Sequence, residues 1–121
     1  MKLMTLVCAA LGLMACGSSS GGAEGSSGGE AAYAGPIAST DTAAGQAVYE
    51  TYCNTCHPDG GEARGPAIRD EHESAAIARQ QVREGGDHMP AFPESRISTD
   101  DLESLLAYMV TLGAVQDTAT P

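Results

Sequence analysis

The most regular pattern of hydrophobic positions lies near the end of the chain, over residues 97–113. Ser98 stands where a helix N-cap belongs, Asp101 completes a weak capping box, and Ile97 can pack on Leu102 as a hydrophobic staple. Gly113 follows the run as a stop signal. The apolar residues at helical spacing are Leu102, Leu105, Leu106, Met109 and Leu112. The pattern predicts an amphipathic helix together with both of its ends.

Two weaker helical patterns precede this one. Asp41 or Thr42 can cap a first helix that runs toward residue 53. A second helix is predicted over residues 73–84, with Gly85 as its stop. The positions expected to face inward are Ala44, Ala47 and Val48 in the first helix, and Ala75, Ala78 and Val82, beside Ile77, in the second. With no strand pattern present, an all-α domain is expected.

The first fifteen residues have the pattern of an export signal. Lys2 precedes an apolar run, residues 3–13, that is too short to span a bilayer as a mature helix. Cys8 lies inside this run and is expected to leave with it. Residues 13–16 resemble the lipobox of bacterial lipoproteins, which makes Cys16 the lipidated first residue of the mature protein and gives it more acyl chains than stable anchoring needs. A plain secretory signal with a chance cysteine at its end is the alternative.

Gly and Ser dominate the residues that follow the signal. The chain is therefore predicted to consist of a signal, a tether, a domain and a tail. Residues 1–15 are a lipoprotein signal peptide, and residues 16–40 are the lipidated cysteine with a flexible tether, because such a composition cannot bury a core. Residues 41–113 form the domain, and residues 114–121 a disordered tail.

The net charge limits the classes of molecule that the protein can bind. The chain of 121 residues has a net charge of -10, and its single lysine, Lys2, leaves with the signal. Nucleic acid is excluded as a partner, because phosphate binding needs clustered Lys and Arg. The acidity favours partners with a basic docking patch. The alternative is that the acidity only keeps the protein soluble.

The candidate chemistry lies in the motif Cys-x-x-Cys-His at residues 53–57. Cys53 and Cys56 lie three apart, as thioether attachment to the two vinyl groups of a haem requires, and His57 follows at once as the proximal iron ligand. A thioredoxin-like pair would need a βαβ context, a zinc site would need further ligands at short spacing, and a disulfide would leave His57 unexplained. The motif therefore predicts one covalent haem c, with iron as the metal.

A haem would also complete a small core. Only roughly eighty residues remain for the domain, which is marginal for apolar burial alone. The chain has no Trp, one Phe and four Tyr, so large side chains are few. A large apolar cofactor would supply the missing interior.

Met89 is the predicted distal iron ligand. Only Met89 and Met109 remain after export, and Met109 lies in a helical pattern where core packing is the default. Met89 lies in the loop 85–93, which glycines open and two prolines stiffen. Ligation by His and Met raises the reduction potential. His88 is the rival ligand.

These elements, in this order, resemble the class I monohaem cytochromes c. The resemblance covers about residues 41–113 and includes Gly65-Pro66, Met89-Pro90 and Tyr108. It implies the all-α small cytochrome c fold, with about three main helices wrapped around one covalently bound haem. It also implies that the Pro66 carbonyl orients His57 and that Gly45 lets the first and last helices cross closely. The candidates to pair with haem propionates are Arg64, Arg69 and Arg96.

The expected function is electron transfer without catalysis. Two strong ligands leave no open site on the iron for a substrate, so the protein is expected to be a carrier and not an enzyme. It is expected to be a monomer, exported and lipid-anchored to the cell envelope, facing the periplasm or the outer side of the cytoplasmic membrane. The alternatives are a haem c subunit of a larger membrane oxidoreductase, and a five-coordinate haem sensor or peroxidase.

Overall fold

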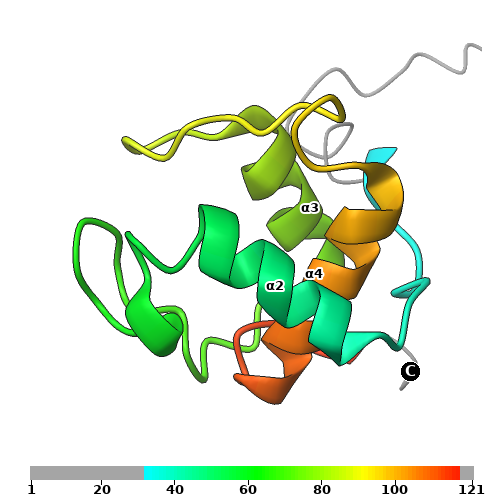
Figure 1. Ribbon diagram of the computed structural model, residues 1–121, viewed down its shortest axis with the longest axis horizontal. Coiled ribbons are helices and arrows are strands. Elements are labelled where there is room, and N and C mark those ends of the chain that lie inside the picture. Colours follow the sequence, from blue (N-terminus) through cyan, green and yellow to red (C-terminus); the bar gives the residue numbers. More distant parts are fainter. Residues whose placement is uncertain (1–31, 118–121) are drawn as a thin grey trace, which may run out of the picture.

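Three α-helices form the frame of the computed structural model, which describes residues 32–117 (Figure 1). They are α2 (Thr42–Tyr52), α3 (Ala75–Glu84) and α4 (Thr99–Thr111), and a single 3-10 turn, η1 (Pro58–Gly60), follows α2. The predicted all-α fold with three main helices is confirmed. Within this part of the chain no helix is both long enough and apolar enough to cross a bilayer. The predicted signal peptide and Cys16 lie outside the described residues.

Each helix begins at a side-chain cap. Ser74 caps α3, so that helix begins at Ala75, two residues later than predicted. Gly85, at φ 68°, ends α3 as expected. Each cap oxygen accepts the backbone N–H of the third residue of its helix: Asp41 from Ala44 (2.9 Å), Ser74 from Ile77 (3.1 Å) and Ser98 from Asp101 (3.1 Å).

Gly45 sets the distance between α2 and α4. A Cβ atom at Gly45 would lie 1.8 Å from the carbonyl oxygen of Ser104 and 2.9 Å from Cβ of Tyr108. The close crossing predicted at this glycine is therefore present. The inward-facing positions of α2 differ from the prediction, because Gly45 and Tyr49 are the buried residues whereas Ala47 is exposed.

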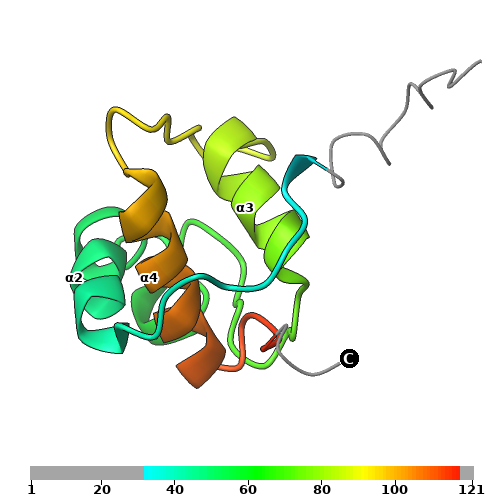
Figure 2. The same cartoon turned by 90° about the vertical axis from the view of Figure 1, so that its right-hand side faces the viewer.

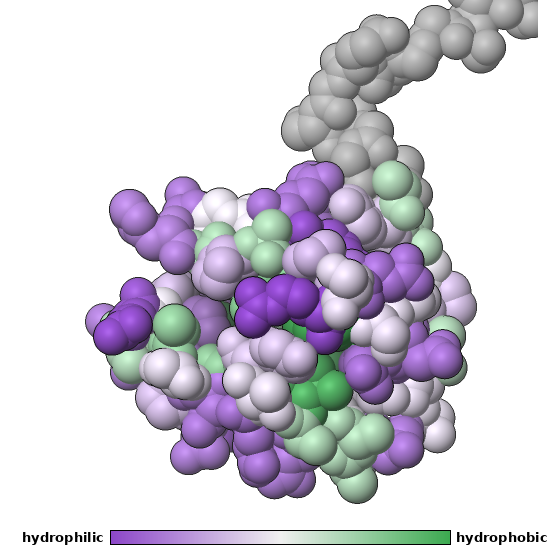
Figure 3. All heavy atoms as spheres, turned by 45° about the horizontal axis from the view of Figure 1, so that its top comes forward, coloured by the Kyte–Doolittle hydropathy of each residue, from purple (hydrophilic) through white to green (hydrophobic). Residues whose placement is uncertain are grey.

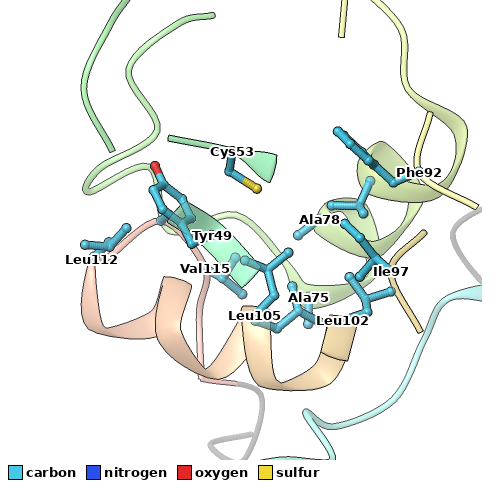
Figure 4. Close-up of a cluster of buried hydrophobic side chains, with 13 residues drawn as sticks. Tyr49, Cys53, Ala75, Ala78, Phe92, Ile97, Leu102, Leu105, Leu112 and Val115 are labelled. Atoms are coloured by element: carbon cyan, nitrogen blue, oxygen red, sulfur yellow. The ribbon is translucent and has the colours of Figure 1, made fainter. Parts of the chain in front are cut away.

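The core gathers between the three helices and the loop after α3 (Figure 4). Ile97 and Leu102 are both buried in it, as the predicted staple requires. Ile77, by contrast, remains 39% exposed. The core residues from α3 and α4 are Ala75, Ala78, Val82, Leu102, Leu105 and Leu106, joined by Tyr49 of α2 and by Phe92 and Ile97 of the connecting loop. The small interior consists mostly of aliphatic side chains.

The N-terminal boundary of the domain lies earlier than predicted. Residues 33–38, here called the N-terminal strap, run across α4 and beside α3 (Figure 2). The buried guanidinium of Arg79 donates to the carbonyl oxygens of Tyr33 (2.8 Å), Gly35 (2.9 Å) and Pro36 (2.9 Å). The prediction of a flexible tether up to residue 40 is wrong for the strap, because backbone carbonyls fasten it to α3.

The C-terminal boundary also differs. Ala114 and Val115 are each 2% exposed, so they belong to the core and not to a disordered tail. The backbone of residues 70–73 pairs with this segment, with Glu73 N–H donating to Ala114 (2.9 Å) and Gln116 N–H donating to Glu73 (2.8 Å). The domain therefore extends beyond residue 113.

Candidate functional site

A cavity of about 760 Å³ lies beside the end of α2. Its walls come from the end of α2 and the turn after it, the loop 64–68, the inner side of α3, the loop 86–92, and side chains in and after α4. The loops that follow α2 and α3 reach out on the same side of the molecule, at the left of Figure 1. The volume is within the range of small-molecule and cofactor sites.

The Cys-x-x-Cys-His motif forms the wall at the end of α2. Cys53 is the C-cap of α2, and the N–H groups of Cys56 (3.1 Å) and His57 (2.9 Å) both donate to its carbonyl oxygen. This tight turn brings both thiols and the imidazole to the same cavity. In Figure 4 the sulfur of Cys53 points toward the space between Tyr49 and Phe92.

Tyr49 fixes the backbone of this turn. Its side chain is 1% exposed, and its hydroxyl donates to the carbonyl oxygen of His57 while accepting the N–H of Gly60 (2.9 Å). Burial raises the pKa of Tyr49 above its ordinary value, so the hydroxyl keeps its proton and remains a donor. This role of Tyr49 was not predicted from the sequence.

The His57 ring is held from its other side by Pro66 and Gly65. Nδ1 of His57 lies 2.7 Å from the carbonyl oxygen of Pro66, which is the contact that the resemblance implied. A Cβ atom at Gly65 would lie 2.3 Å from Cε1 of His57 and 2.8 Å from both ring nitrogens. Only glycine allows the backbone to approach the imidazole so closely.

The two motif cysteines form no disulfide with each other in this structure. Burial, with a smaller contribution from Cys56, raises the pKa of Cys53 to about 12. Redox-active cysteine pairs have lowered pKa values, because the thiolate is the nucleophile. The raised pKa of Cys53 therefore argues against a thioredoxin-like redox pair.

A tight turn presents Met89 to the cavity. Gly86 and Met89 exchange two backbone hydrogen bonds (3.0 and 2.9 Å), and Asp87 and His88 between them have φ values of 51° and 73°. Two central residues with positive φ define a type I′ turn, and Asp and His enter this region more readily than most residues. The half-buried Met89 side chain lines the cavity and packs on the core.

The other methionine and the other two histidines of the domain lie in different surroundings from Met89 and His57. His88, at the tip of the turn, is exposed although it borders the cavity. Met109 also lines the cavity, from within α4, and packs on the core as predicted. His72 is exposed, on the backbone that pairs with residues 113–116.

The three arginines considered as partners of haem propionates lie in different surroundings. Arg64 is exposed and borders the cavity. Arg69 instead donates to the carbonyl oxygen of Asp59, and Arg96 lies over the rings of Tyr52 (5.7 Å) and Phe92 (5.4 Å). Of the three, Arg64 is thus the candidate that borders the cavity.

The residues fit a covalently attached porphyrin. Both thiols, an imidazole with one nitrogen already engaged, and a thioether line one cavity whose other walls are largely apolar. A helical fold with this site defines a c-type cytochrome domain. Residues 40–109, more than half of the chain, match the family described as cytochrome c oxidase, cbb3-type, subunit III, and the chain belongs to this family.

Membership in the family establishes the coarse function. The chain is an electron-transfer haem protein, with one covalently bound haem c whose metal is iron. Comparisons with curated proteins and with solved structures gave no significant match.

Proposed function

We propose that the chain is a membrane-anchored monohaem cytochrome c that carries single electrons, with His57 and Met89 as iron ligands. The observation that carries the proposal is that His57, held by Pro66, and Met89, presented by a tight turn, line the same cavity. The haem iron would supply the one-electron couple. The residues of the chain would hold the two iron ligands in place.

The contact with Pro66 selects the ring nitrogen of His57 that is free for iron. A carbonyl oxygen only accepts hydrogen bonds, so Nδ1 of a neutral His57 donates to Pro66 and Nε2 keeps its lone pair. Tyr49 and Gly65 confine the same residue from the backbone side and from one face of the ring. A ligand held in this way keeps its place in both oxidation states, as fast electron transfer requires.

The anchor and the partner follow from sequence and charge. We propose that Cys16 is lipidated and that the domain faces the periplasm or the outer side of the cytoplasmic membrane. Hydrophilic side chains cover much of the face seen in Figure 3, with the most apolar residues near its centre and paler apolar patches toward its edges. With a net charge of -10, such a surface favours redox partners with a basic docking patch.

The family description favours a second candidate. It names subunit III of a cbb3-type cytochrome c oxidase, so this chain is also a candidate haem c subunit of a membrane oxidase complex. Solubilisation of the membrane in mild detergent, followed by purification of the tagged chain, separates the two. A catalytic subunit that co-purifies at fixed stoichiometry supports the subunit, and isolation of the chain alone supports the carrier.

Absorption spectra of the oxidised and reduced holoprotein test the ligation. Replacement of Met89 by Leu should remove the sixth ligand, abolish the thioether charge-transfer band of the ferric form and allow carbon monoxide to bind the ferrous form. Met109→Leu, the matched control, should leave the wild-type spectrum unchanged.

Two outcomes would contradict the proposal. A six-coordinate spectrum that survives Met89→Leu refutes Met89 as ligand, and its loss in His88→Ala would assign the site to the rival histidine. Carbon monoxide binding by the reduced wild-type protein at neutral pH would favour a five-coordinate sensor or peroxidase.

A further inference from the structure

Gln81 donates a hydrogen bond to the sulfur of Met89. Gln81 lies in the last turn of α3, and its side-chain nitrogen Nε2 is 3.5 Å from Sδ of Met89. The same nitrogen lies 3.4 Å from the carbonyl oxygen of Gly86. Because the amide nitrogen carries two hydrogens, one side chain reaches both the first and the last residue of the type I′ turn.

Backbone hydrogen bonds hold Gln81 close to the loop that carries Met89. The N–H of Gly85 donates to the carbonyl oxygen of Gln81 (2.8 Å), and the N–H of Phe92 donates to that of Val82 (2.8 Å). Both ends of the loop that carries Met89 are therefore bonded to adjacent residues of α3. The backbone of Gln81 and the loop that carries Met89 are thereby held close together.

A hydrogen bond at this sulfur has a definite electronic effect. A thioether sulfur has two lone pairs, so one can bind iron while the other accepts an N–H. The N–H withdraws electron density from the sulfur, which weakens its donation to ferric iron more than to ferrous iron. The positive end of the amide dipole, directed at the sulfur, disfavours the ferric charge as well. Both effects raise the reduction potential.

We propose that Gln81 is a positioning residue for Met89 and sets the electron-donating strength of that ligand. The inference rests on the proposed ligation by His57 and Met89, and it assigns to Gln81 a part in setting the reduction potential. Hydrogen bonds to metal ligands tune metal centres in general.

Redox titration of three variants of the holoprotein tests the proposal. In Gln81→Leu the equilibrium constant for reduction should fall about three- to tenfold, which is about 30–60 mV for a one-electron couple. Gln81→Asn keeps an amide but shortens the side chain beyond reach of the sulfur, so it should shift the potential in the same direction. Gln80→Leu is the matched control, because Gln80 donates to Glu84 on the exposed side of the same helix, and its potential should equal that of the wild type.

The thioether charge-transfer band distinguishes the possible failures. The band should persist in Gln81→Leu, because the backbone bonds that hold the loop remain. A potential equal to that of Gln80→Leu would overturn the proposal, and so would loss of the band with carbon monoxide binding, which would show that Gln81 only holds the loop. Absence of the band from the wild-type protein would instead refute the ligation by Met89, on which the inference rests.

Discussion

At the scale of single residues, the site depends on how closely the chain approaches His57. The Gly65 backbone lies against one face of the ring, and the Pro66 carbonyl oxygen lies at Nδ1. The imidazole thus has one orientation and one tautomer before any metal is considered.

Gly65→Ala should displace the His57 ring. Its Cβ would meet Cε1 of His57 at 2.3 Å, and overpacking of this kind costs about 1–3 kcal/mol. We expect less haem per polypeptide, measured by absorption against total protein, and a lower free energy of unfolding. Gly61→Ala is the control, because Gly61 has φ -86° and its Cβ would approach only the Pro58 oxygen, at 3.0 Å. Equal haem content in the two variants would contradict the role of Gly65.

Sequence reasoning reached part of this site and missed the rest for a physical reason. The cysteines and His57 are recognisable because their chemistry depends on spacing along the chain. Tyr49 and Gln81 act on groups that turns bring to them, a backbone carbonyl and N–H for Tyr49 and a sulfur beyond a type I′ turn for Gln81. No local pattern of residue types marks either contact.

At the scale of elements, local signals predicted the helices better than they predicted which faces are buried. The caps at Asp41 and Ser98 and the stop at Gly85 act on neighbouring backbone groups, so the sequence contains them in full. The buried face of α2 depends on how closely α4 approaches, which puts Gly45 and Tyr49 inside and leaves Ala47 exposed. The prediction is therefore wrong for Ala47, whereas Val48 packs against the core as expected.

Two substitutions in α2 separate helix propensity from packing. Propensity alone makes Gly45→Ala stabilising and Ala47→Gly destabilising, each by about 1 kcal/mol. The structure predicts that both destabilise and that Gly45→Ala is the worse, because its Cβ would lie 1.8 Å from the Ser104 oxygen. Denaturant unfolding of the holoprotein measures both values. A stabilised Gly45→Ala protein would show that the two helices can separate without cost.

At the scale of the whole molecule, Arg79 joins three parts of the chain. Its guanidinium pairs with Glu103 of α4 through two hydrogen bonds (2.7 and 2.9 Å) and donates three more to the strap. All five guanidinium N–H groups are therefore used. Backbone carbonyls accept three of these bonds, and any residue type provides a carbonyl. This explains why the composition of residues 33–38 gave no sign that they are fastened.

Arg79→Met should release the strap while leaving the cytochrome fold in place. Glu103 would keep its buried charge without the oppositely charged partner, and breaking such an ion pair costs about 3–5 kcal/mol. The amide of Ala38, which donates to Glu103 (2.8 Å), should exchange its hydrogen at least about a hundredfold faster. Arg69→Met, a substitution of an exposed arginine, should leave that exchange rate unchanged.

Low pH should weaken the contacts of Glu103 with Arg79 and with the strap. Burial alone would raise the pKa of Glu103, but hydrogen bonds from Arg79 and Ala38 hold it below its ordinary value. The stabilisation is thus complete above the ordinary Glu pKa of about 4.3 and is lost as the pH falls through the lowered value. Ala38 exchange should accelerate in that acid range, after correction for its intrinsic rate. Glu103→Gln should abolish this pH dependence, and its persistence in that variant would assign it to another group.

The strap also determines where a mechanical load enters the domain. A pull on the chain from its N-terminal side reaches residues 33–38 before it reaches α2, and the bonds of Arg79 transmit it to α3 and α4. The turn that contains Cys53 and His57 lies at the far end of α2, beyond this point. Tension on the N-terminus is therefore borne by the pair of Arg79 and Glu103, and the geometry around the iron ligand is spared.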